Sequence, residues 1–149
     1  MTYLLDTDTF VFLIRGLKSA RRPARQRAEL LARKCQKVWS GGDTVGLSAI
    51  TVSELELGAR RSGKYEAEMA AYRKAVAPFT FYEYDAVLCP PPYGRIRQEL
   101  ESKGITIGAM DLLIAAHALA LDATLVSNNV AHFSRVSGLK TENWLVERR

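Results

Sequence analysis

The sequence predicts an α/β protein with a central, mostly parallel sheet of about five strands covered by helices. Short apolar runs alternate with helical periodicity along the 149 residues, and no internal repeat, low-complexity tract or linker interrupts them. Alternation of this kind is typical of a parallel sheet whose strands are joined by helices. The length suits a single core that buries about two-thirds of the unfolded surface, so we expect one domain over residues 1–149.

The first strand is the apolar run that ends in LLD, and a short helix follows it. Pro23 opens a second helix, because proline is favourable at a first helical position. This helix is expected to end before Gly41 and Gly42, and its apolar residues recur at helical spacing: Ala28, Leu31, Cys35 and Val38.

The middle of the chain predicts a strand, two helices and another strand. The strand TVGLSAI is followed by the helix TVSELELGARRSG, which Gly63 stops. A second helix runs up to Pro78, and TFYEY is the next strand. The apolar stripe of that second helix consists of Tyr65, Met69, Tyr72 and Val76.

The last third of the chain begins with three consecutive prolines. Proline is excluded from a helix interior but tolerated in the first turn, so we predict a helix from about Pro92. The segment MDLLIAAHALALDA predicts an apolar helix with Asp111 in its first turn, and TLVSNN a short strand that ends in polar residues. A turn through AHFSRVSGL and a strand near ENWLV end the chain.

Composition narrows the class of protein. The chain is 48% hydrophobic and 25% charged, with no apolar run near the roughly 20 residues of a membrane span. No secretory signal is visible, so we expect a cytoplasmic protein. Cys35 and Cys89 lie far apart without metal-ligand spacing, which argues against a disulfide framework or a zinc site. The net charge of +5 favours a polyanionic partner such as nucleic acid.

Three acidic residues occupy corresponding positions in the predicted fold. Asp6 ends the first strand, Glu54 lies in the helix after the second, and Asp111 opens the helix before TLVS. Each has a structural explanation: Asp6 as a helix cap, Glu54 as the end of a capping box from Thr51, and Asp111 through the helix dipole. However, the strand-to-helix turns of a parallel sheet all lie along its carboxyl edge, so the three carboxylates are expected to converge in one crevice.

Clustered carboxylates predict a divalent cation. Three anions in one crevice raise one another's pKa values unless a cation neutralises them. An all-oxygen site with few ligands suits Mg²⁺ or Mn²⁺, and either ion supports phosphoryl chemistry. A basic chain with such a site is a candidate nuclease.

Several motifs together resemble a known family across essentially the whole chain. LLDT, TVSELELG, GAMDLLIAAHALAL and TLVSNNVAHFSRVSGLKTENW resemble the PIN-domain ribonucleases, and more narrowly the VapC-type toxins of type II toxin-antitoxin modules. The resemblance implies a PIN-like three-layer α/β/α fold and an endoribonuclease that depends on Mg²⁺, for which Mn²⁺ substitutes. It also implies inhibition by a VapB-type antitoxin, a homodimer, and an antitoxin groove lined by the helices near Glu54 and Tyr65.

The resemblance also implies the site residues. Catalytic positions fall on Asp6, Glu54, Asp111 and Asn129, with Asp6 and Asp111 as metal ligands. Asn129 stands where many relatives have a fourth Asp and adds no charge, which leaves open whether one or two metal ions bind. Asp8 stands where relatives often carry Asn, so it either restores part of the missing charge or is a turn residue.

Two other functions compete with this interpretation. The loop DTDTF resembles the nucleophile loop of haloacid-dehalogenase-type phosphatases, but Phe10 breaks that motif. The other alternative is a non-catalytic basic RNA-binding domain whose acids only cap helices. His117 and His132 lack metal-ligand spacing and receive no catalytic role. The basic residues are expected to form a solvated face or, as a hypothesis, a track for RNA phosphates: Lys18, Arg21, Arg22, Arg25, Arg27, Arg60 and Arg61.

Overall fold

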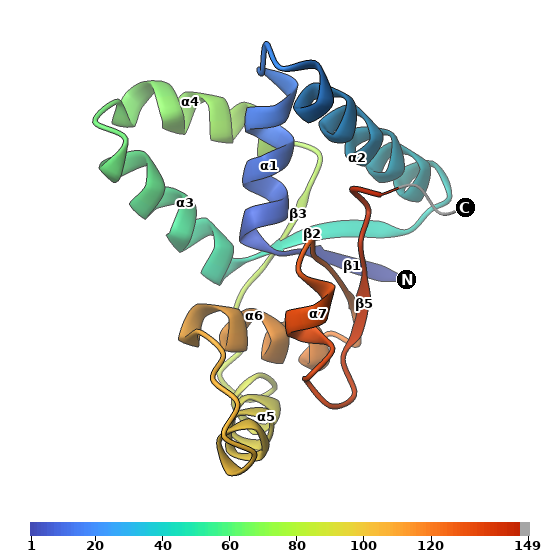
Figure 1. The fold of residues 1–149 in the computed structure, drawn as a ribbon, viewed down its shortest axis with the longest axis vertical. Helices are drawn as coiled ribbons and strands as arrows, with labels where there is room; N and C mark the ends of the chain where they lie inside the picture. The colour runs from blue at the N-terminus through green and yellow to red at the C-terminus, as the bar shows by residue number, and fades with distance from the viewer. Residues whose placement is uncertain (147–149) are drawn as a thin grey trace.

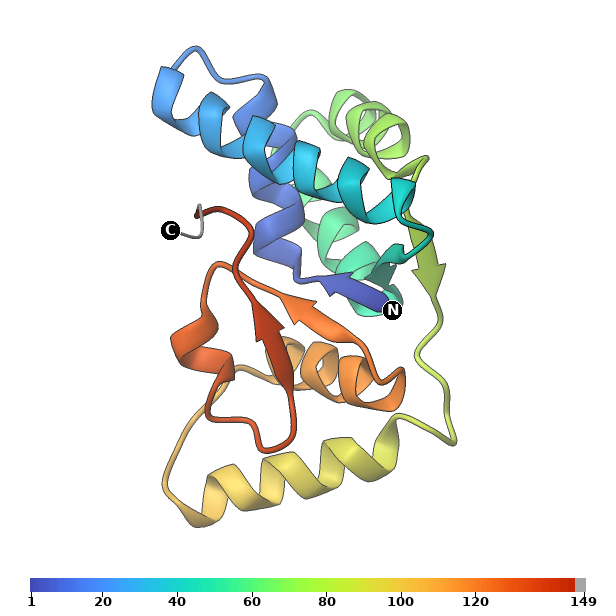
Figure 2. The same ribbon diagram turned by 90° about the vertical axis from the view of Figure 1, so that its right-hand side faces the viewer.

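A five-stranded sheet lies between two layers of helices in a computed structural model that describes residues 1–146 (Figures 1 and 2). The strand order is β3-β2-β1-β4-β5, and every neighbouring pair is parallel. This arrangement confirms the predicted fold class. The strands are β1 (Thr2–Leu5), β2 (Thr44–Ser48), β3 (Thr80–Tyr82), β4 (Thr124–Val126) and β5 (Lys140–Glu142).

Four helices cover one face of the sheet and three cover the other (Figure 2). The first group is α1 (Thr7–Leu17), α2 (Arg22–Ser40), α3 (Ala49–Arg61) and α4 (Tyr65–Val76). The second group is α5 (Pro90–Ser102), α6 (Ala109–Ala120) and α7 (Val130–Phe133). Within residues 1–146, no helix is long and apolar enough to cross a membrane.

Alternate residues of the central strand β1 enter different cores. Leu5 packs in the core under the first group of helices, and Leu4 packs in the core under the second. Both side chains are fully buried. A strand buried on both faces reads as a continuous apolar run, which explains why TYLL shows no polar alternation.

The chain builds the sheet outward from β1, first on one side of this strand and then on the other. From β1 it crosses to β2 and then to β3, and only afterwards adds β4 and β5 on the opposite side. The connections therefore diverge between β1 and β4, where open α/β sheets place their ligands. The two strands remain joined at this point, because the Asp6 backbone N–H donates to the Val126 carbonyl at 3.0 Å.

Three predicted boundaries differ from the structure. The helix α5 begins at Pro90 rather than near Pro92, because all three prolines fit the first turn, whose N–H groups need no helical partner. The helix after β2 begins at Ala49 instead of near Thr51. The last strand is Lys140–Glu142 rather than ENWLV, and Trp144 and Leu145 instead pack in the core beneath α1–α4.

Candidate active site

Asp6 is the buried residue at the centre of the carboxyl edge. It follows β1 and caps α1, since its Oδ1 accepts the Thr9 backbone N–H at 2.9 Å. Its other oxygen, Oδ2, accepts the Ser127 hydroxyl at 2.6 Å. The residue is only 5% exposed. The capping role expected for Asp6 is therefore real, but it occupies only one of the two carboxylate oxygens.

Ser127 connects Asp6 to the end of β4. Its hydroxyl donates to Asp6 and accepts the Asn129 backbone N–H at 2.9 Å. Asn129 thus joins the network through its main chain, at the start of α7 and on the exposed side of the sheet edge. No hydrogen bond given for residues 1–146 ties the Asn129 side chain to the acids.

Glu54 is positioned by a hydroxyl from α1 and does not cap its helix. The cap of α3 is Ser48, whose Oγ accepts the Ile50 N–H, so Glu54 lies in the second turn and the predicted capping box is wrong. Thr7 Oγ1 lies 2.6 Å from Glu54 Oε1 and 3.0 Å from Thr51 Oγ1. Because Thr7 has one hydroxyl proton, it donates to the carboxylate and accepts from Thr51.

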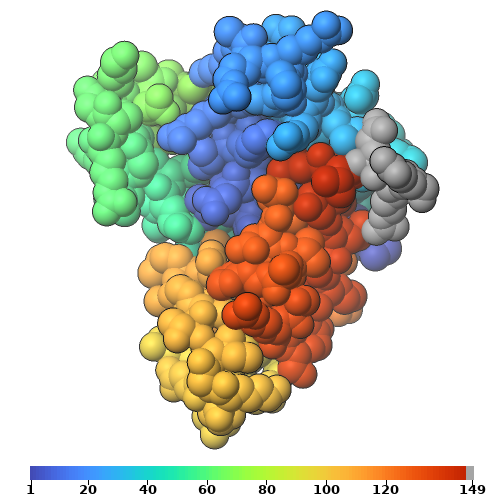
Figure 3. Space-filling model, in the orientation of Figure 1, coloured from blue at the N-terminus to red at the C-terminus, as the bar shows by residue number. Residues whose placement is uncertain are grey.

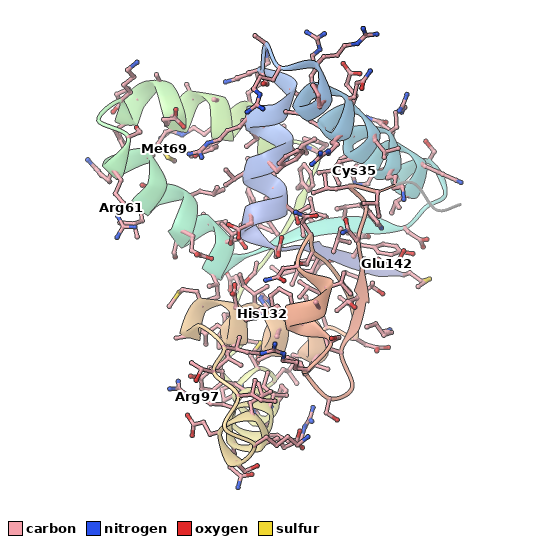
Figure 4. The ribbon with its side chains drawn as sticks, viewed as in Figure 1. Cys35, Arg61, Met69, Arg97, His132 and Glu142 are labelled. Atoms are coloured by element: carbon pink, nitrogen blue, oxygen red, sulfur yellow. The ribbon has the colours of Figure 1, made fainter. Side chains whose placement is uncertain are left out.

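Asp111 lies in the first turn of α6 and faces His132 of α7. The His132 Nε2 and Asp111 Oδ2 atoms are 3.4 Å apart, which is long for a hydrogen bond, so the contact acts mainly through charge. Figure 4 shows His132 beside α6. The Asp111 side chain is 46% exposed. It is therefore more accessible than Asp6.

Burial and mutual repulsion raise the pKa values of all three predicted acids. Burial is the main cause of the raised pKa of Asp6, which its hydrogen bonds to Ser127 and Thr9 partly offset. Burial also raises the pKa of Glu54, against the Thr7 hydrogen bond, and the charges of Asp111, Asp8 and Asp6 raise it further. For Asp111, burial raises the pKa, nearby His132 lowers it, and Asp8 raises it.

Asp8 belongs electrostatically to the same site. Its charge contributes to the raised pKa values of Asp6, Glu54 and Asp111. The residue is exposed in the first turn of α1, where the helix dipole favours an acid. Figure 3 shows the blue α1 at the surface, between the green α3 and the orange α6–α7 segments. The start of α1 is therefore open to solvent where the helices of the two faces of the sheet adjoin.

The acids fit a hard divalent cation by chemistry, although each now engages a protein donor. An anionic, all-oxygen donor set is what Mg²⁺ and Mn²⁺ prefer. Within residues 1–146, no three His, Cys, Asp or Glu side chains are already gathered at metal-ligand spacing. Thr7, Ser127 and His132 hold the carboxylates individually, which limits their repulsion when no cation is bound.

Sequence reasoning missed the polar residues that hold the acids. Thr7 was part of the quoted motif LLDT and Ser127 of SNN, but neither was singled out. A hydroxyl one residue after a strand-end acid is a common turn feature, so the sequence carries no specific signal for either residue. His132 helps to hold the turn that carries Asn129, because its backbone N–H donates to the Asn129 carbonyl at 3.1 Å. The sequence gives no sign that its side chain also contacts Asp111.

His117 lies outside the acidic site. It is 1% exposed, and its Nδ1 lies 2.7 Å from Ser48 Oγ. Because the Ser48 oxygen already accepts the Ile50 N–H, the hydroxyl donates to Nδ1. Burial lowers the pKa of His117, which favours the neutral ring. His117 is thus a buried residue of the fold, and its place outside the acidic site agrees with the absence of a catalytic role for it.

Comparisons with known proteins place the chain in a family. The model of the PIN domain matches residues 3–139. Ribonuclease VapC2 of Rickettsia felis is 36% identical over 144 residues, covering 97% of this chain and 98% of that protein. The tRNA(fMet)-specific endonuclease VapC of Shigella flexneri is 31% identical with the same coverage.

Solved structures agree with these relatives. The crystal structure of VapBC2 from Rickettsia felis bound to a DNA fragment from their promoter contains a chain with a TM-score of 0.79 and 35% identity, covering 97% of this chain and 99% of that one. A chain of the structure of VapBC-1 from nontypeable Haemophilus influenzae has a TM-score of 0.81 and 30% identity. The match covers 97% of this chain and 98% of that one. The chain therefore belongs to the PIN-domain family and, within it, to the VapC ribonuclease toxins of VapBC toxin-antitoxin systems.

The raised pKa of Glu54 predicts that this residue lowers stability. A carboxyl whose pKa is raised by folding is favoured in its protonated form, so its penalty grows as pH rises from the ordinary carboxyl range through the raised value. We expect Glu54→Gln to raise the thermal unfolding midpoint of the metal-free protein by a few degrees at pH 7, and by little near pH 4. Scanning calorimetry in the presence of chelator, at pH 7 and at pH 4, measures the unfolding midpoints of both proteins.

The matched control is Glu66→Gln, an exposed acid in the first turn of α4. This substitution removes the same charge, and we expect no comparable rise of the unfolding midpoint at pH 7. Equal midpoints for wild type and Glu54→Gln at pH 7 would contradict the predicted electrostatic penalty.

Proposed function

We propose that the chain is a Mg²⁺-dependent endoribonuclease that hydrolyses RNA at Asp6, Glu54 and Asp111, with Mn²⁺ as a substitute. The observation that carries this proposal is the group of acids at the divergence of β1 and β4, whose pKa values are raised by burial and by neighbouring carboxylates, among them Asp8. Three such acids destabilise the folded protein when no cation is present, and their oxygens suit the binding of a divalent cation. When bound, the cation supplies an activated water and neutralises charge on the phosphate.

The acids take different roles because their surroundings differ. Asp6 and Asp111 hold the cation, from the ends of β1 and the first turn of α6. Glu54 binds Thr7 through Oε1, which leaves Oε2 to accept a proton from the attacking water. Its raised pKa makes it a stronger proton acceptor than an exposed carboxylate. Ser127 keeps Asp6 oriented and is a positioning residue.

The alternative phosphatase function receives no support from the segment DTDTF. Thr7 to Phe10 form the first turn of α1, and Phe10 is fully buried in the core, so this segment begins a helix and forms no nucleophile loop. The non-catalytic alternative explains Asp6 as a cap, but it leaves the desolvated Glu54 without a purpose. Hydrolysis by an acid-held cation accounts for both residues.

An apolar groove between α1, α2 and α4 supports an antitoxin partner. It has a volume of about 410 Å³, and Leu13, Leu17, Trp39 and Phe79 contribute apolar lining. Lys18 and Lys74 also line it, which suits an apolar peptide with acidic neighbours. The solved relatives include the complexes VapBC2 and VapBC-1. We propose that a VapB-type antitoxin binds here. The sequence resemblance implied a groove lined by α3 and α4, whereas this groove shares α4 and adds α1 and α2.

The remaining parts of the proposal concern substrate and assembly. Relatives named tRNA(fMet)-specific endonucleases make folded RNA of the tRNA class the first substrate to test. Such an enzyme acts in the cytoplasm, as a single PIN domain over residues 1–149. A homodimer is consistent with the apolar side chains exposed at and beyond the edge strand β3: Phe81, Val87 and Leu88.

Substitution of Asp6 by Asn, Glu54 by Gln or Asp111 by Asn is expected to reduce RNA cleavage by at least about 100-fold, since each removes a metal ligand or a proton acceptor. Chelator should abolish wild-type cleavage, and added Mg²⁺ or Mn²⁺ should restore it. The products should carry 5′-phosphate and 3′-hydroxyl ends. Gel assays and end mapping measure all three results.

The exposed acid Asp122 provides a control, because Asp122→Asn removes a charge far from the site at the end of α6. It should cleave RNA normally. Full activity of any folded site variant, or cyclic phosphate ends, would contradict the mechanism.

Replacing Asn129 by Asp should tighten divalent-metal binding if its side chain turns toward the acids, because a fourth charge strengthens attraction for the cation. Calorimetric titration with Mn²⁺ measures this change, with Asn128→Asp as the neighbouring control. Faster cleavage is not expected, because ground-state binding alone does not lower the barrier. Unchanged Mn²⁺ affinity would remove Asn129 from the site.

The antitoxin groove is tested with two leucines of similar exposure. Leu17 lines the groove and is 45% exposed, whereas Leu57 lies on α3 and is 48% exposed. Leu17→Glu should weaken binding of the cognate antitoxin by roughly tenfold or more, since it removes apolar burial and adds a charge. Leu57→Glu should have little effect in the same binding assay. The opposite result would place the antitoxin beside α3.

A further inference from the structure

The positive charge of this protein is concentrated in one segment. Residues 15–37, from the end of α1 through most of α2, contain nine of the 21 lysines and arginines but one of the 16 acids. The rest of the chain contains 12 basic and 15 acidic residues. The net charge of +5 therefore originates on and next to α2.

The solvent side of α2 displays these cations in a row. Arg22, Arg33 and Lys37 are exposed and recur at helical spacing on one side of the helix. Figure 4 shows side chains that end in nitrogen projecting outward from α2. The opposite side of the helix is buried against the core and consists of Ala28, Leu31 and Cys35.

Acids neutralise this row only in part, because residues 15–37 contain nine cations and one acid. The ion pair between Arg25 and Glu29 spans 3.9 Å, and both side chains are about half exposed, so it is weak. Lys37 lines a groove together with Asp43 and Glu142. A second groove, of about 520 Å³, runs beside the helix, and its lining includes Gln26, Arg27, Glu29 and Arg33. Its donors are mainly amide and guanidinium groups, which suit phosphate oxygens.

The helix is held rigidly against α1. A Cβ on Gly16 would lie 2.6 Å from the Ala28 Cβ and 3.1 Å from the Ala24 carbonyl oxygen, so the two helices approach as closely as glycine permits. Figure 1 shows α2 packed alongside α1. The basic row therefore has a fixed place relative to Asp6, which caps the start of α1.

The basic row lies away from the acids at both of its ends. The helix α1 has 11 residues, so Arg22 at the start of α2 lies about 16 Å from the acidic site. Lys37, near the other end of α2, lies by Asp43 at the amino edge of the sheet, opposite the carboxyl edge that carries Asp6. Charges in solution are largely screened beyond about 8 Å at physiological salt. The cations of α2 are thus positioned to hold a different part of a polyanion from the part at the acids.

We propose that the solvent side of α2, with Arg22, Arg33 and Lys37 at its centre, is a docking surface for the phosphate backbone of a folded RNA substrate. The proposal rests on the ribonuclease function proposed above and adds a second contact region remote from the cleaved bond. RNA fits better than a protein partner, because this side of α2 exposes cations without an aromatic anchor, whereas the apolar groove lies on its other side.

The test compares two triple variants that remove equal charge. Arg22→Gln/Arg33→Gln/Lys37→Gln alters the row, and Lys64→Gln/Arg97→Gln/Lys103→Gln removes three exposed cations elsewhere. Figure 4 shows Arg97 beside α5, away from α2. Binding of a tRNA pool is measured by fluorescence anisotropy in chelator over a range of salt. Cleavage is measured with Mg²⁺ on the tRNA pool and on an oligonucleotide of about four nucleotides, which is shorter than α1 at roughly 3.4 Å per stacked nucleotide.

The row variant should bind tRNA roughly tenfold or more weakly, and its slope of log affinity against log salt should fall by about 2, as three lost phosphate contacts require. Its KM for tRNA should rise, while cleavage of the short oligonucleotide stays at the wild-type rate. The control variant should keep a clearly steeper salt slope than the row variant.

Three outcomes would overturn the proposal: an unchanged salt slope in the row variant, equal losses in both variants, or loss of antitoxin binding without loss of RNA binding. An inactive wild-type protein on both substrates would instead refute the ribonuclease function itself. The two failures are therefore distinguishable.

Discussion

Mutual repulsion among carboxylates in a partly buried crevice is the constraint on which the rest of this structure depends. Asp6, Glu54 and Asp111 come from three different elements and meet where β1 and β4 diverge. Each charge is opposed by burial, and Asp8 adds to the repulsion from the first turn of α1. Folding overcomes this penalty through two buried cores, which fix the strands whatever the charge state of the acids.

The hydrogen bonds around the acids limit that penalty without removing the charge. Thr7 donates to Glu54, Ser127 donates to Asp6, and His132 lies beside Asp111. A neutral hydroxyl stabilises a carboxylate while leaving its affinity for a cation largely intact, which a lysine or arginine at the same place would not do. The site is thus stable enough to fold and remains anionic enough to attract a divalent metal ion. Such a compromise between stability and activity is typical of functional sites.

Opposite charges are separated within the molecule. Acids converge at the carboxyl edge of the sheet, while the surplus of lysine and arginine lies on and near α2. A nuclease must attract a polyanion and yet keep anionic groups at the bond that it cuts. The two kinds of charge are separated along the length of α1, and screening limits the effect of the cations on the acids. The apolar groove between α1, α2 and α4 leaves a third surface for a protein partner.

The sequence by itself determined the fold class and most of the order of the elements, and it singled out three acids that the structure places near one another. Apolar runs such as TYLL and periodic stripes such as Ala28, Leu31 and Cys35 are local patterns that burial imposes directly on the chain. Exact boundaries were less certain. The three prolines of α5 and the early start of α3 depend on which residue satisfies the first turn, and that choice involves neighbours in space.

Only the tertiary structure decided how the acids are held. Ser127 lies 121 positions from Asp6 in the sequence and Thr51 lies 44 positions from Thr7, so no local pattern reveals these contacts. The same holds for Glu54: its local sequence fits a capping box, but Ser48 takes that role and leaves Glu54 to Thr7. Local patterns follow from the chemistry of adjacent residues, whereas the environment of a charge follows from the groups that folding brings around it, and these come from anywhere in the chain.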